Sequence, residues 1–184
     1  MENLQPEKGL FLDRDGVINI DYGYVYRQSQ FEFVDGIFDI CRAAVQRGYS
    51  IFVVTNQAGI GRGYYSEQDF EELMSWVRAQ FAAQDCPIRE VYYCPTHPEF
   101  GVGAYKCASL RRKPQPGMIL DAVRDFKVDL AASILVGDKE SDIQAGLAAG
   151  VGRNFLYASG EGRRELQTRA DAVLTDLRDL LALL

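Results

Sequence analysis

The sequence has few cysteines, no long apolar run and no excess of basic residues, and each absence excludes a class of protein. Its 184 residues include four cysteines, one histidine, and 20 lysines and arginines against 26 aspartates and glutamates. A nucleic-acid-binding protein needs a clustered basic face, which a net charge of −6 argues against. We therefore expect no nucleic-acid partner, and a small ligand held by local positive groups.

Segments that would place the chain in a membrane are also lacking. No apolar run is long enough to span a bilayer, and the polar N-terminal stretch 1–8 has no signal-peptide core. A cytoplasmic protein with no membrane partner is expected. In that compartment the four cysteines are better explained as thiols or metal ligands than as disulfides. The acidic composition and the absence of long apolar seams favour a monomer.

The chain is long enough, at 47% hydrophobic residues, to bury one good core, so residues 1–184 are expected to form a single domain. Apolar segments typical of strands lie at 9–12, 50–54, 88–93, 133–137, 154–157 and, at an edge, 172–174. Helical patterns alternate with them at 37–45, 66–81, 118–126, 141–149 and 176–183. This alternation predicts an α/β fold: a doubly wound, Rossmann-like, mostly parallel sheet with helices on both faces.

Two aspartates follow the first strand, two residues apart. In an extended segment Asp13 and Asp15 point the same way, so both can face one pocket. Two carboxylates at such short range repel each other unless a cation lies between them or one of them is protonated. A divalent metal, or a nucleophile with an acid/base partner, explains the pair. The alternative is a solvated turn at Asp15-Gly16.

Polar residues gather at the ends of other strands as well. Thr55 and Asn56 follow the second strand, Asp138 follows the fourth, and Lys113 ends a long loop. Each has a plain alternative: a turn cap for Thr55, a helix N-cap for Asp138, a solvated side chain for Lys113. Parallel strands, however, present their carboxyl ends at one edge of the sheet. Carboxylates there suit oxygen-ligated Mg²⁺, which leaves room for phosphate oxygens, and so predict phosphoryl chemistry.

Four segments carry a family resemblance: LDRDGVIN at 12–19, TNQAGI at 55–60, RKPQPG at 112–117 and GDKESD at 137–142. In order and approximate spacing they resemble the signature motifs of haloacid dehalogenase-like phosphatases. Within these, the chain resembles the heptose 1,7-bisphosphate 7-phosphatases, with histidinol-phosphate phosphatases as near relatives. The resemblance runs from about residue 8 to the last helix. It implies the same α/β fold and, since no segment between the motifs is long enough, no large cap domain.

The resemblance also implies roles. Asp13 would be the nucleophile that becomes an aspartyl phosphate, and Asp15 the general acid and then the general base. Mg²⁺ would be held by the Asp13 carboxylate, the Asp15 carbonyl and the Asp138 carboxylate, while Lys113 and Thr55 would bind phosphoryl oxygens. Further expected substrate contacts are Asp21, Tyr22, Gly23, Tyr24, Asn56, Gln57, Ala58, Arg112 and Lys139.

The reaction implied is removal of the 7-phosphate from a small sugar bisphosphate. Two alternatives stay open: a phosphatase for histidinol phosphate or another small phosphomonoester, and an inactive binding or scaffold domain. A binding module has no need for Asp13, Asp15, Lys113 and Asp138 together, so the intact set favours an enzyme.

The loop 94–112 departs from the family pattern. The family commonly binds zinc there through Cys-x-His followed by Cys-x-Cys, but Thr96, Ser109 and Arg111 stand at three of those four positions. Cys94, His97 and Cys107 could still supply three ligands in a shifted register. An unmetallated loop held by packing is the favoured expectation.

Overall fold

The computed structural model describes residues 6–159 and 167–184, which form a six-stranded sheet with helices. Residues 1–5 of the polar N-terminal stretch lie outside the described part. The strands are β1 (Lys8–Leu12), β2 (Tyr49–Asn56), β3 (Ile88–Cys94), β4 (Asp129–Gly137), β5 (Arg153–Tyr157) and β6 (Ala172–Leu174). They lie in the order β3-β2-β1-β4-β5-β6, and every neighbouring pair is parallel. The predicted parallel sheet is confirmed.

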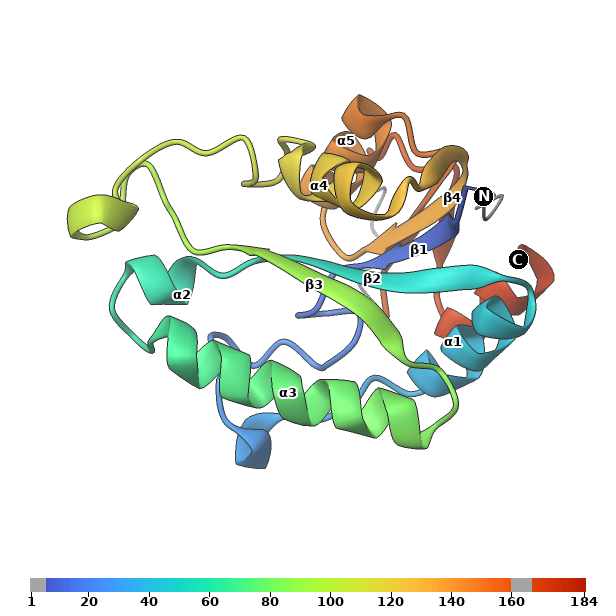
Figure 1. Ribbon diagram of the computed structural model, residues 1–184, viewed down its shortest axis with the longest axis horizontal. Coiled ribbons are helices and arrows are strands. Elements are labelled where there is room, and N and C mark those ends of the chain that lie inside the picture. The colour runs from blue at the N-terminus through green and yellow to red at the C-terminus, as the bar shows by residue number, and fades with distance from the viewer. Residues whose placement is uncertain (1–5, 160–166) are drawn as a thin grey trace, which may run out of the picture.

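Helices cover both faces of this sheet, as predicted. They are α1 (Ile37–Gln46), α2 (Ala58–Gly61), α3 (Glu67–Ala83), α4 (Gly117–Phe126) and α5 (Glu140–Ala149), with 3₁₀ turns η1 (Gln28–Gln30), η2 (Gly103–Tyr105) and η3 (Leu177–Ala182). Figure 1 shows α4 and α5 on one side of the sheet and α1 and α3 on the other. In the described residues no connection between strands holds a unit of the size of a cap domain.

Each face of the sheet has its own core, because successive side chains of a strand point to opposite faces. In β1, Leu10 and Leu12 belong to the core beneath α1 and α3, whereas Phe11 belongs to the core beneath α4 and α5. All three side chains are fully buried. Strand β1 is therefore buried on both faces, and this packing fixes the position of Asp13, the residue that follows it.

Local signals explain where the helices begin and end. Ser66 and Asp69 form a capping box at the start of α3, in which the Ser66 hydroxyl accepts the Asp69 N–H and Asp69 accepts the Ser66 N–H. Helix α5 ends at Gly150, whose φ of 89° is left-handed and favours glycine. Asp138 is not the N-cap of α5, an alternative the sequence left open, since Lys139 occupies that position.

Two elements differ from the sequence-based expectation. The four-residue helix α2 follows β2 directly and was not expected, because one turn is too short to show a helical period. The C-terminal segment, expected as a helix over 176–183, is the 3₁₀ helix η3 instead. Of the helices that the structure describes, none is long and apolar enough to cross a bilayer.

Candidate active site

The residues expected to carry chemistry lie at the carboxyl edge of the three central strands. Asp13 follows β1, Thr55 lies near the end of β2, and Asp138 follows β4. The Asp13 N–H donates to the Val136 carbonyl (3.1 Å), so the parallel pairing of β1 and β4 extends to the aspartate itself. Asp13 and Thr55, together with Asp15 and Lys113, line a cavity of about 570 Å³ at this edge.

Lys113 is a buried cation at the centre of this edge. Its ammonium Nζ lies 2.9 Å from Asp13 Oδ1 and 2.6 Å from Asp142 Oδ1, and it donates to the Val54 carbonyl at 2.8 Å. Burial lowers the pKa of Lys113, but the two carboxylates outweigh burial, and the pKa is raised overall. Lys113 is therefore a permanent positive charge beside Asp13.

Three carboxylates share this small volume with a single buried lysine. Oxygen atoms of Asp13, Asp138 and Asp142 all lie within 4.8 Å of one another. Burial, opposed by the Lys113 ammonium and reinforced by the other two carboxylates, raises the pKa of Asp13 to about 8. Burial also raises the pKa of Asp138. When all three carboxylates are ionised, the cluster holds more negative charge than its lysine can neutralise.

The same cluster fits a divalent cation. Asp138 Oδ1 is buried and has no hydrogen-bond partner among the described residues. Gly16 makes room for this side chain, since a Cβ there would lie 2.4 Å from Asp138 Oδ2. An unpartnered carboxylate oxygen beside two further carboxylates is an oxygen-only donor set, which hard cations such as Mg²⁺ prefer.

Asp142 was missed as a site residue by the sequence-based analysis. Besides its ion pair with Lys113, its second oxygen accepts the Lys139 N–H (2.9 Å) at the start of α5. Gly137 lets it approach, because a Cβ at that position would meet the Asp142 Cβ at 2.2 Å. No helical spacing pointed to it, because Asp138 lies before α5 and Asp142 within it, so the turn between β4 and α5 brings the two together.

Asp15 lines the same cavity as Asp13 and Lys113. Its carboxylate accepts hydrogen bonds from Arg14 Nη2 (2.7 Å), Asn19 Nδ2 (3.1 Å) and Gln57 Nε2 (3.1 Å). The side chain is 18% exposed, so it can reach a ligand in the cavity. Arg14 and Asn19 were not singled out from the sequence.

The expected substrate contacts mostly border the same cavity. It is lined by Asp21, Gly23, Tyr24, Asn56, Gln57, Ala58, Arg112 and Lys139, together with the unexpected Arg62, Tyr65 and His97. Tyr22 does not line it; its hydroxyl donates to Glu32 Oε2 (2.6 Å), and it borders a neighbouring hollow. The Asn56 side chain accepts the Lys113 N–H (3.0 Å) and donates to the Lys113 carbonyl (3.1 Å), and so positions the lysine.

The three candidate zinc ligands are not brought together. Cys94 is buried and contacts the Thr96 hydroxyl, His97 Nδ1 accepts the Glu99 and Phe100 N–H groups, and Cys107 is exposed. Within residues 6–159 and 167–184, the carboxylate cluster is the one group of three or more His, Cys, Asp or Glu side chains close enough to share an ion.

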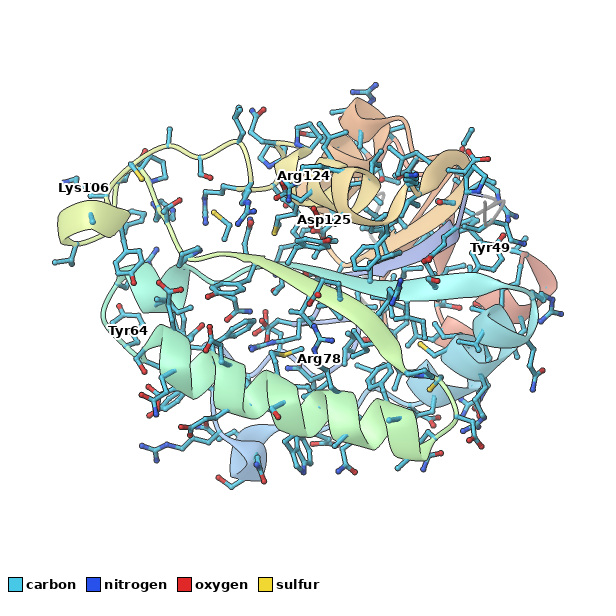
Figure 2. All side chains as sticks on the ribbon, viewed as in Figure 1. Tyr49, Tyr64, Arg78, Lys106, Arg124 and Asp125 are labelled. Carbon is cyan, nitrogen blue, oxygen red and sulfur yellow. The ribbon has the colours of Figure 1, made fainter. Side chains whose placement is uncertain are left out.

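Protein contacts hold the loop 94–112 instead. Tyr105 Oη donates to Glu67 Oε1 of α3 (2.5 Å), Arg111 pairs with Asp121 of α4 (2.6 Å), and Arg112 Nη1 donates to the Thr96 carbonyl (3.1 Å). In Figure 2, Lys106 at the tip of this loop and Tyr64 next to α2 lie at the same end of the molecule. Two residues of the loop, His97 and Arg112, line the cavity.

Comparison with known proteins places these features in a family. A family model described as HAD-hydrolase-like matches residues 110–180. A D-glycero-α-D-manno-heptose-1,7-bisphosphate 7-phosphatase from Burkholderia mallei is 56% identical over 96% of this chain and 93% of its own length. A D-glycero-β-D-manno-heptose-1,7-bisphosphate 7-phosphatase from Haemophilus influenzae is 45% identical over 94% of each chain.

A solved structure agrees with these relatives. The crystal structure of D,D-heptose 1,7-bisphosphate phosphatase from B. bronchiseptica, complexed with magnesium and phosphate, superimposes with a TM-score of 0.82. It is 28% identical in sequence, and the match covers 96% of this chain and 97% of that one.

Proposed function

Because this chain belongs to the heptose 1,7-bisphosphate 7-phosphatase family of haloacid dehalogenase-like hydrolases, we propose that it is a Mg²⁺-dependent phosphatase that removes the 7-phosphate of D-glycero-D-manno-heptose 1,7-bisphosphate. The observation that carries the proposal is Asp13, buried beside Lys113 and facing the cavity. A carboxylate so placed can attack a phosphorus atom whose oxygens the lysine binds.

In the first step Asp13 forms a bond to phosphorus, and the bond from phosphorus to the sugar oxygen breaks. Asp15, which lines the same cavity, gives its proton to that oxygen. In the second step Asp15 takes a proton from water, the water oxygen bonds to phosphorus, and Asp13 is released. Lys113 and the Thr55 hydroxyl hold the phosphoryl oxygens throughout.

Asp13 and Asp138 would hold Mg²⁺, with the Asp15 carbonyl, and Asp142 lies close enough to support it. The bound ion would supply positive charge that reduces repulsion between the nucleophile and the phosphoryl group. The magnesium in the B. bronchiseptica structure supports this assignment.

The rest of the substrate would occupy the outer cavity. Asp21, Gly23, Tyr24, Gln57 and Ala58 line it, and Arg112 with Lys139 would supply positive charge for the second phosphate. Lys139 also pairs with Asp21 and Asp138, at 3.6 and 3.3 Å, which ties Asp21 to the carboxylate cluster. The relative at 56% identity is named for the α anomer, so that anomer is the first to test.

We further propose a cytoplasmic monomer that serves lipopolysaccharide or other surface-glycan synthesis. Free thiols at all four cysteines suit a reducing compartment. One chain carries every group that the reaction uses, so a second copy is not required. Light scattering on the purified protein tests the oligomeric state.

Phosphate release with Mg²⁺ from the α and β heptose bisphosphates and from histidinol phosphate, measured side by side, tests the function. A clear preference for a heptose substrate is expected. Equal weak release from all three would leave a phosphatase of unassigned substrate, and no release from any would remove the enzymatic proposal.

The nucleophile is tested by Asp13→Asn. We expect phosphate release to fall by more than about 10³-fold, because an amide cannot form the acyl phosphate. The circular dichroism spectrum should be unchanged. Asp35→Asn, the same change at an exposed residue paired with Arg178, should retain full activity. Substantial turnover by Asp13→Asn would exclude Asp13 as the nucleophile.

A further inference from the structure

Arg14, between the two aspartates, is a fully buried cation that the mechanism above does not use. Its Nη2 donates to Asp15 Oδ1 (2.7 Å) and to the Val25 carbonyl (2.6 Å). Its Nε and Nη1 are buried with no hydrogen-bond partner among the described residues. A guanidinium stays charged in proteins, and a buried charge needs a counter-charge. The Asp15 carboxylate supplies that counter-charge when it is ionised, and its Oδ1 can accept the same hydrogen bond when Asp15 carries the proton that it donates.

The other oxygen of Asp15 is held from the opposite side by a second buried pair. Gln57 Nε2 donates to Asp15 Oδ2 (3.1 Å) and to the Thr55 hydroxyl (2.9 Å). Tyr65 Oη donates to Gln57 Oε1 at 2.5 Å, which fixes which end of the amide faces Asp15. Burial raises the pKa of Tyr65 to about 12, so its hydroxyl keeps the proton it donates.

The Tyr65 ring is itself fixed in place. It stacks on the Tyr26 ring with centroids 5.1 Å apart and an interplanar angle of 6°. Gly59 packs against it, since a Cβ at position 59 would lie 2.3 Å from the Tyr65 Cε1. Each oxygen of Asp15 is thus bonded to a side chain that cannot move freely.

We propose that Arg14 and the Tyr65–Gln57 pair are positioning residues that hold the Asp15 carboxyl group in the orientation needed for proton transfer to the leaving oxygen. This inference rests on the proposed function of Asp15 as general acid. Gln57 then orients Asp15 and does not contact the substrate through its side chain, because both ends of its amide are already hydrogen-bonded within the protein.

The leaving group provides a readout that a merely structural role would not change. A sugar alkoxide needs a proton as its bond to phosphorus breaks, whereas 4-nitrophenolate leaves without one. The ratio of kcat/KM for the sugar bisphosphate to kcat/KM for 4-nitrophenyl phosphate therefore reports proton donation. Loss of phosphoryl binding, of metal or of folded protein would lower both values together.

Tyr65→Phe is the first variant, because it removes one hydroxyl and keeps the stacked ring. We expect kcat/KM to fall about tenfold for the sugar bisphosphate and less than about twofold for 4-nitrophenyl phosphate. Tyr26→Phe, the same change in the partner ring, should leave the ratio at its wild-type value. Equal losses on both substrates in Tyr65→Phe would overturn the proposal and assign the pair to Thr55 and phosphoryl binding.

Arg14→Met and Arg14→Lys test whether Arg14 holds the Asp15 carboxyl group in place. The ratio should fall by about 100-fold in Arg14→Met, and Arg14→Lys, which keeps the charge, should restore part of it. A ratio unchanged in both variants would overturn the role of Arg14. Tyr65→Phe decides the proposal if Arg14→Met does not fold.

Failure of the proposed function has a different signature. If the wild type cleaves another alkyl phosphomonoester in place of the heptose substrate, that ester replaces the sugar bisphosphate in the ratio and the same outcomes apply. If the wild type cleaves 4-nitrophenyl phosphate but no alkyl phosphomonoester, Asp15 does not act as a general acid and the positioning role falls with it.

Discussion

Lys113 forms ion pairs with two buried carboxylates, those of Asp13 and Asp142. The contribution of each pair to stability depends on whether the carboxylate is ionised. Because the pKa of Asp13 is raised to about 8, Asp13 is largely protonated at pH 7 without a bound cation. The ion pair with Asp142 at 2.6 Å is then the main one that balances the Lys113 charge. Both side chains of that pair are 3% exposed, so solvent screens them little.

We therefore expect Asp142→Asn to be strongly destabilising. Removing one partner of a buried ion pair typically lowers the free energy of unfolding by about 3 to 5 kcal/mol. Urea unfolding at pH 7 without Mg²⁺ would measure the change, with Asp35→Asn as the exposed comparison. A loss no larger than that of Asp35→Asn would show that Asp142 is not needed to balance Lys113.

The raised pKa of Asp13 also predicts how pH and Mg²⁺ act together. The folded protein keeps a proton on Asp13 that the unfolded chain, with an ordinary pKa of 3.8, releases. This contribution to stability is complete below about pH 3.8 and is lost as pH rises toward 8. Ionised carboxylates are what a cation binds, so the increase in Tm caused by Mg²⁺ should be larger at pH 8 than at pH 5.5.

Thermal unfolding with and without Mg²⁺ at the two pH values measures this difference. Asp138→Asn serves as the control: with one carboxylate fewer in the cluster, most of the Mg²⁺ effect should disappear. An equal increase in Tm at pH 5.5 and pH 8 would contradict the assigned cluster.

At the residue level the sequence predicted the groups that follow strands. Asp13, Thr55 and Asp138 could be placed at one edge because that placement follows from strand ends alone. Arg14, Asp142 and the Tyr65–Gln57 bond could not, because they depend on which side chains meet in three dimensions. Tyr22 shows the converse: a neighbour in sequence of residues that line the cavity points away from it.

Among the elements, α3 does more than cover the sheet. Its first residue, Glu67, accepts hydrogen bonds from Tyr93 of β3 (2.6 Å) and Tyr105 of the loop 94–112 (2.5 Å). These bonds lower the pKa of Glu67, Tyr105 contributing most, so the carboxylate stays ionised at neutral pH. The helix N-terminus thereby anchors the loop that carries His97 and Arg112 to the cavity.

Loss of that anchor should affect substrate binding more than chemistry. Tyr105→Phe is expected to raise KM for the heptose bisphosphate about two- to tenfold with kcat little changed, because one hydrogen bond contributes about 0.5 to 1.5 kcal/mol. Tyr93→Phe removes the other bond to the same glutamate, but from a strand, and should leave KM unchanged. Steady-state kinetics on both variants measure this difference. Equal KM values for Tyr105→Phe and Tyr93→Phe would show that the loop does not depend on Tyr105.

Elements with a clear period or cap were predictable, and short ones were not. The helical pattern over 66–81 placed α3 correctly. Helix α2 has a single turn, and η3 carries a capping box at Asp176 that suits an α-helix and a 3₁₀ helix alike. Residues 94–112 contain only the short turn η2, so their course depends on tertiary contacts.

For the whole molecule, alternating strands and helices predicted the parallel sheet, but not the strand order. That order depends on pairing between distant segments: β1 lies between β2 and β4, which is more than 100 residues away in sequence. Local patterns do not encode such pairing.

The absence of a cap-sized unit among the described residues predicts that the molecule keeps its shape when it binds ligands. Small-angle X-ray scattering without ligand, and with Mg²⁺ and orthovanadate, should give the same radius of gyration within error, because residues 6–159 and 167–184 hold no second domain that could close over the cavity. Unfolded protein provides the positive control for sensitivity. A clear decrease on ligand binding would reveal a closure that this architecture does not provide for.

The position of β1 also has a consequence for biosynthesis. As the chain leaves the ribosome, β1 can pair with β2, and β2 with β3, while the other edge of β1 stays open until residues 129–137 have emerged. Asp13 is therefore made early, but its partners Lys113, Asp138 and Asp142 are made late. A nascent chain therefore lacks the complete cluster until roughly its last quarter is being synthesised, and a translation product that ends before Asp142 could not assemble it.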